Sequence, residues 1–103
     1  VAPMAVWFPI NGTKLTDKDL INIGNYAEII KKSGNKFKIL GSADKATGSK
    51  KINQKLSEGR ANAVYNALVN KFGVDPSKLE VIAKGDENEP FDKPVLNRVV
   101  ILE

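Results

Sequence analysis

The spacing of apolar residues in the first third of the chain predicts one strand followed by one helix. The side chains of Val6, Phe8 and Ile10 alternate with those of Trp7 and Pro9. This alternation indicates a short strand that Pro9 ends or places at a sheet edge. Apolar residues then recur every three or four positions over 17–32, as on one face of a helix. Thr16 is placed to cap its start, and Gly34 follows its end.

The rest of the chain predicts strand, helix, strand and strand. Residues 37–40 include aromatic Phe37 and β-branched Ile39 and are followed by Gly41, which indicates a strand, and the apolar residues of 53–71 have helical spacing. Residues 79–84 alternate as in a half-buried strand, whereas 99–102 form a continuous apolar run, typical of a strand buried on both faces. The polar segment 85–94 between them contains two prolines and predicts a surface loop.

This order, β-α-β-α-β-β, predicts a single α+β domain over residues 1–103. The simplest architecture is a mixed four-stranded sheet with two helices packed on one face. A chain of 103 residues is long enough for one core. It begins at Val1 rather than Met, which we interpret as a mature form or a domain cut from a longer protein.

Composition narrows the chemistry that is open to this chain. It has no cysteine and no histidine, which excludes disulfides, thiolate catalysis, zinc sites built on those residues and Ser-His nucleophiles. No apolar run approaches the roughly 18 residues that span a bilayer. The net charge is +4, and all sixteen basic residues are lysine except Arg60 and Arg98. Such a lysine-rich surface attracts polyanions weakly or serves only to solubilise the protein.

Arg60 is the most unusual residue of the pattern. The helical spacing places it on the apolar stripe of the second helix, between Leu56 and Val64. Because a buried guanidinium without a partner is costly, we expect an anionic group to meet it. Asp44, just past the strand at 37–40, is one candidate, and the pair would then be a structural salt bridge. A ligand carboxylate is the other candidate, and the residues alone leave both open.

Several motifs, in order, resemble one known family over nearly the whole chain. The sequence is similar to the OmpA-like C-terminal domain, a peptidoglycan-binding module shared by OmpA, Pal and MotB proteins. Between Asp44 and Asn53 it is one residue longer than the family pattern, and Gly59 stands where arginine is common. The motifs that carry the resemblance are Val6-Trp7-Phe8-Pro9-Ile10-Asn11, Gly41-Ser42-Ala43-Asp44, Asn53-x-x-Leu56-Ser57-x-x-Arg60-Ala61-x-x-Val64, Lys84-Gly85 and Asn97-Arg98-Val99-Val100.

The resemblance implies a binding site for the stem peptide of peptidoglycan. In the family, the residues that match Asp44 and Arg60 hold the free stereocentre of diaminopimelate, the acid on its ammonium and the arginine on its carboxylate. Asn11 and Asn53 would add hydrogen bonds, although turn and cap roles compete for both. Arg98 either supports the site or caps the last strand. A structure that sealed both Asp44 and Arg60 beneath the surface would argue against such a site.

The resemblance also implies a cellular setting. It indicates no enzyme, no cofactor and no metal, but a module at the periplasmic face of the outer membrane, attached through a region that precedes Val1. A homodimer stays open, and nucleic acid is not an expected partner. Two rival interpretations remain: a basic α/β nucleic-acid-binding module, which residues 37–39 support only faintly, and a hydrolase that uses Asp44 with Glu58 or Asp86.

Overall fold

The structure is a computed structural model, and it describes residues 2–45, 48–86 and 97–103. The order of helices and strands confirms the predicted α+β class. The elements are β1 (Met4–Trp7), α1 (Asp17–Lys32), β2 (Phe37–Gly41), α2 (Lys50–Asn66), the π-helical turn η1 (Ala67–Lys71), the 3-10 turn η2 (Pro76–Lys78), β3 (Leu79–Ala83) and β4 (Val99–Leu102).

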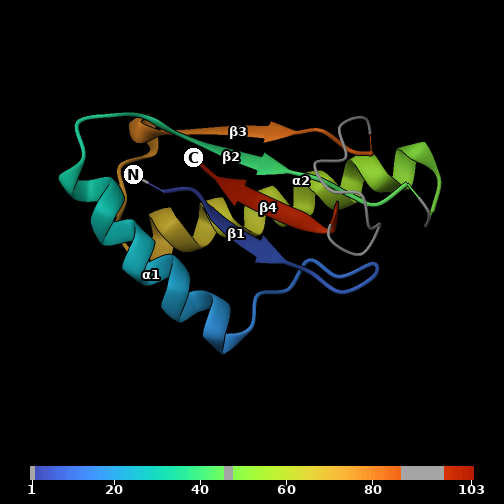
Figure 1. The fold of residues 1–103 in the computed structure, drawn as a ribbon, viewed down its shortest axis with the longest axis horizontal. Helices are drawn as coiled ribbons and strands as arrows, with labels where there is room; N and C mark the ends of the chain where they lie inside the picture. Colours follow the sequence, from blue (N-terminus) through green and yellow to red (C-terminus); the bar gives the residue numbers. More distant parts are fainter. Residues whose placement is uncertain (1, 46–47, 87–96) are drawn as a thin grey trace.

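The four strands form one mixed sheet in the order β1-β4-β2-β3. β2 and β3 are parallel, whereas β4 is antiparallel to both of its neighbours. β4 therefore lies inside the sheet, and Val99, Val100 and Leu102 are fully buried, as the continuous apolar run predicts. Figure 1 shows α2 crossing behind β2 and β4, and α2 contacts both strands.

Both helices share one hydrophobic core with a single face of the sheet. The register places Val6 opposite Val100 and Ile39 opposite Leu102, so these four side chains lie on the same face. The two helices therefore cover that face and form a two-layer domain, as expected. The buried helical residues of this core are Ile23, Tyr26, Ala27, Ile30, Ala61, Val64, Ala67 and Leu68, the last two in η1.

α1 begins as its sequence predicts. The Thr16 hydroxyl accepts a hydrogen bond from the Asp19 amide at 3.1 Å, and the Asp19 carboxylate accepts one from the Thr16 amide at 3.0 Å. This reciprocal capping box satisfies two amides that the helix itself cannot pair. Lys31 and Lys32 occupy the last turn, where positive charge is favoured.

α2 differs from the prediction in where it begins and which face it buries. It starts at Lys50 rather than Asn53, because the Ser49 hydroxyl accepts a hydrogen bond from the Ile52 amide at 3.2 Å and caps the helix earlier. Ile52, one turn before Leu56, falls on the apolar stripe that helical spacing predicts, but it is 50% exposed. The buried side of the helix from its start to Arg60 is instead polar and consists of Asn53, Ser57 and Arg60.

The predicted surface loop at 85–94 lies mostly outside the described residues. Its first two residues, Gly85 and Asp86, are described and are buried, which corrects the prediction for them. Gly85 accepts a hydrogen bond from the Ala43 amide at 2.8 Å and donates its own amide to the Ser57 hydroxyl at 2.9 Å. These two bonds hold the turn after β3 between β2 and α2.

Gly41 allows β2 and α2 to approach closely. A Cβ atom at this position would overlap the Ser57 carbonyl oxygen and lie 2.9 Å from the Ala61 Cβ. No side chain fits there, so α2 can lie directly against the end of β2.

We predict that Gly41→Ala lowers the free energy of unfolding by about 1–3 kcal/mol, because the added methyl must push α2 away from the sheet. Urea unfolding followed by circular dichroism measures the change. Gly34→Ala is the matched control, since nothing lies within 4 Å of a Cβ there. Equal stability of the two variants would contradict the close approach.

Candidate functional site

Arg60 is buried near the middle of α2 and is held mainly by backbone oxygens. Its side chain is 1% exposed. Nε donates to the Gly12 carbonyl at 2.9 Å, Nη1 to the Ser42 carbonyl at 3.1 Å and Nη2 to the Pro9 carbonyl at 3.2 Å. The guanidinium carbon lies 5.7 Å from the centre of the Phe8 ring, within cation-π distance. The sequence predicts an anionic partner for Arg60, whereas the hydrogen-bond acceptors among the described residues are neutral backbone carbonyls.

The tight turn after β1 presents two of these carbonyls. The Gly12 amide donates to the Pro9 carbonyl at 3.0 Å and closes the turn. Asn11 is exposed and has a φ of 55°, a left-handed conformation that asparagine adopts more readily than most residues. The turn role considered for Asn11 is therefore present in the structure. Through this turn, Asn11 helps to aim two backbone acceptors at Arg60.

Asp44 forms an ion pair with Arg98. Its side chain is fully buried, and Oδ2 accepts from Nε of Arg98 at 2.9 Å. Arg98 precedes β4 and its side chain is 19% exposed. A structural salt bridge was one interpretation of Asp44, but the partner that the structure gives it is Arg98 rather than Arg60. Arg98 thus supports the acidic side chain of the candidate site.

Three charged groups share this buried region. Burial lowers the pKa of Arg60, and the charge of Arg98 lowers it further, whereas the charge of Asp44 raises it. Arginine stays protonated at neutral pH despite such a shift. Arg60, Arg98 and Asp44 therefore form a cluster with two positive charges and one negative charge.

Asn53 links this cluster to a second acid. Its Nδ2 donates to the Asp44 carbonyl at 3.2 Å and to Oδ2 of Asp86 at 3.0 Å. Asp86 is 8% exposed and brings the formal charge of the four ionised groups to zero. Oδ1 of Asn53 is buried and has no hydrogen-bond partner among the described residues. A buried acceptor of this kind is rare and suits a donor from outside the protein.

Ser57 is a positioning residue that the family match includes but our site prediction omits. It is fully buried, donates to the Gln54 carbonyl at 2.8 Å and accepts from the Gly85 amide. Its signal in the sequence is its spacing from Asn53 and Arg60, which puts three polar residues on one helix face. Glu58, proposed for the hydrolase, is exposed and does not join this face.

The site is closed in this structure. Asp44 and Arg60 are each 1% exposed, so the open cleft that the sequence led us to expect at both side chains is absent among the described residues. A groove of about 560 Å³ lies beside the cluster and reaches it through Asp86. This groove, called the basic groove below, is lined by Lys50, Lys51, Gln54, Lys55, Glu58 and Asp86.

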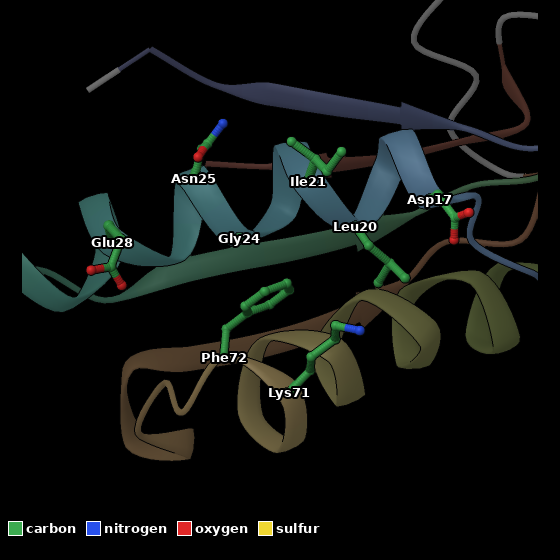
Figure 2. Close-up of a pocket in the computed structure, with 8 residues that line it drawn as sticks. All are labelled: Asp17, Leu20, Ile21, Gly24, Asn25, Glu28, Lys71 and Phe72. Carbon is green, nitrogen blue, oxygen red and sulfur yellow. The ribbon is translucent and has the colours of Figure 1, made fainter.

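A second groove, of about 590 Å³, lies between α1 and η1 (Figure 2). Leu20 points into it from α1, and the Phe72 ring points toward the backbone at Gly24. Neither Asp44 nor Arg60 lines it, so its size does not make it the better candidate for charged ligands.

The described ranges contain no group of three acidic side chains placed to hold a metal ion. None of their helices combines the length and hydrophobicity that crossing a membrane requires.

Comparison with known proteins places this geometry in a family. The sequence pattern of the OmpA family matches residues 7–98. Outer membrane protein 41 of Porphyromonas gingivalis is 43% identical over 89 residues, which cover 85% of this chain and 22% of that protein. The chain therefore spans less than a quarter of the length of that relative.

Solved structures show the same fold. The peptidoglycan-associated lipoprotein from Burkholderia pseudomallei superposes with a TM-score of 0.87 and 24% identity, covering 95% of this chain and 86% of that one. The cell wall anchor of the type VI secretion system from Pseudomonas aeruginosa gives a TM-score of 0.79 and 18% identity, covering 97% and 78%. The family match, which extends over most of the chain, confirms the resemblance seen in the motifs: the chain belongs to the OmpA family.

Proposed function

We propose that this chain is a non-catalytic module that binds peptidoglycan through the diaminopimelate of its stem peptide and anchors the outer membrane to the cell wall. It would act at the periplasmic face of that membrane. The observation that carries the proposal is the buried cluster of Arg60, Arg98 and Asp44 beside Oδ1 of Asn53, which has no hydrogen-bond partner among the described residues. The wall association named for the structurally similar Burkholderia and Pseudomonas proteins supports it.

The hydrogen-bonding capacity of Arg60 suits a carboxylate. A guanidinium carries five N–H groups, and three of them donate to carbonyls in this structure. The two that remain belong to Nη1 and Nη2, one on each nitrogen. A pair of this kind is the fork that holds a carboxylate at two points.

The acceptors of the site suit an ammonium. The carboxylate of Asp44 and Oδ1 of Asn53, which has no partner within the described ranges, can both accept hydrogen bonds from one. The free end of diaminopimelate carries an ammonium and a carboxylate on the same carbon, so its net charge is zero. Binding of this zwitterionic end therefore leaves the formal charge of the cluster, counted over Arg60, Arg98, Asp44 and Asp86, at zero.

Binding requires the closed site to open, because Asp44 and Arg60 are buried. The apparent association constant then equals that of the open form multiplied by the fraction of molecules that are open. A modest affinity for short stem peptides follows from this arrangement.

We predict that Asp44→Asn weakens binding to purified cell-wall sacculi at least about 30-fold, because removing one side of a charged contact typically costs 2–5 kcal/mol. Co-sedimentation measures the loss, with circular dichroism to show that the variant is folded. Asp17→Asn, at an exposed position of α1, is the matched control and should bind normally.

Free meso-diaminopimelate should displace the unchanged protein from sacculi, whereas Nα-acetyl-lysine, whose ammonium and carboxylate lie on different carbons, should not. Normal pull-down by Asp44→Asn would contradict the proposed site. Equal displacement by both compounds would contradict its specificity for diaminopimelate.

We predict that Arg60→Ala destabilises the fold by about 3–5 kcal/mol, because it removes a buried charge and leaves three carbonyls without their donor. Arg98→Ala should cost less, since Arg98 is partly exposed and has a single ion pair in the described structure. Urea unfolding compares the two variants. If both variants lose the same free energy of unfolding, the three hydrogen bonds from Arg60 to backbone carbonyls add little to stability.

A further inference from the structure

We propose that the basic groove is a second contact for the cell wall, in which Lys50, Lys51 and Lys55 bind carboxylates of the stem peptide that flank the residue held at Asp44 and Arg60. The inference rests on the proposed function. It adds a subsite outside the cluster and names the chemistry of its ligand, an acidic peptide segment.

The three lysines form an exposed cationic edge along the first two turns of α2. Lys51 and Lys55 are four residues apart and lie on the same side of the helix, where like charges repel each other. Within the described ranges, none of the three lysines has an ion pair. Glu58, the exposed acid of the groove, is hydrogen-bonded to Gln54 Nε2 at 3.4 Å.

The groove adjoins the buried cluster at Asp86. Asp86 lines it and also accepts from Asn53, which donates to the Asp44 carbonyl. Gln54, on the same wall, donates to the Ala83 carbonyl at 3.2 Å and fixes that wall to the end of β3. A peptide whose ammonium reaches Asp44 therefore extends along Asp86 into the basic groove.

The three lysines do not stabilise the helix that carries them. The first turn of α2 contains no acidic residue, although the positive end of the helix dipole favours one. α1 shows the usual arrangement, with Asp17 and Asp19 in its first turn. Neutral residues at the three lysine positions should therefore leave folding unchanged or improve it, which makes a binding test simple to interpret.

Exposed ion pairs are individually weak and are screened by salt. We expect the triple variant Lys50→Gln/Lys51→Gln/Lys55→Gln to bind sacculi about 10-fold more weakly at low ionic strength, near 0.02 M. At about 0.5 M salt, where the Debye length is only a few ångströms, it should bind like the unchanged protein. Co-sedimentation over a range of salt concentrations measures both affinities.

The matched control is Lys32→Gln/Lys36→Gln/Lys38→Gln, which removes the same charge from three exposed lysines. These positions run from the last residue of α1 to the second residue of β2, at the opposite end of the long axis from the start of α2 (Figure 1). The control should keep normal binding. Equal losses of sacculus binding in the two triple variants would show that the effect depends only on net charge. That result would overturn the proposal.

Two further arms identify the ligand. Amidation of the stem-peptide carboxylates other than those of diaminopimelate should abolish the advantage of the unchanged protein over the basic-groove variant. Phosphatidylglycerol vesicles are the second arm. If the unchanged protein binds them as tightly as sacculi and the basic-groove variant does not, the groove belongs to a lipid surface and the proposal fails.

Failure of this inference is distinct from failure of the proposed function. Asp44→Asn should lose sacculus binding at every salt concentration, whereas the basic-groove variant should lose it only at low salt. Normal low-salt binding by the basic-groove variant, together with loss in Asp44→Asn, would reject the second contact alone. Normal binding by Asp44→Asn would reject the proposed function.

Discussion

The rest of the structure depends on how the buried guanidinium of Arg60 is satisfied. Its three hydrogen bonds join α2 to the turn after β1 and to the segment that follows β2. An unpaired charge at this depth would destabilise the fold, so the three backbone segments must keep their carbonyls in place. The same bonds fix the position of Ser42, two residues before Asp44, and therefore position the acid that forms the proposed site.

α2 divides the domain into an apolar end and a polar end. Its second half and η1 place Val64 and Leu68 in the core that both helices share with the sheet. The part of the helix from its start to Arg60 buries Asn53, Ser57 and Arg60, which are matched by backbone groups and acids rather than by apolar side chains. Packing thus stabilises one end of the helix, while hydrogen bonding organises the other end for a polar ligand.

The charges of the polar end are arranged as pairs and bridges rather than as isolated ions. Arg98 neutralises Asp44, and Asn53 connects Asp44 to Asp86. A closed site of this kind is already satisfied without a ligand, apart from one amide oxygen among the described residues. The proposed ligand therefore has to replace existing interactions, and the lysines of the basic groove would assist by attracting an acidic peptide before the site opens.

The sequence by itself determined the features that depend on neighbouring residues. The caps of α1, the order of helices and strands and the burial of β4 follow from local spacing and from continuous apolar runs, and the motifs indicated the family. Helical spacing also marked Arg60 as a residue that needs a partner. These signals are local in the chain, so no tertiary information was required to read them.

Only the tertiary structure decided which groups meet. The carbonyls that accept from Arg60 belong to residues 18, 48 and 51 positions away along the sequence. Arg98, which pairs with Asp44, is 54 positions away from it. Periodicity defines the faces of a helix but not which face meets the sheet, which is why Ile52 is half exposed and Ser57 is buried. The closed state of the site likewise depends on packing between distant segments, which the spacing of residues along one chain does not encode.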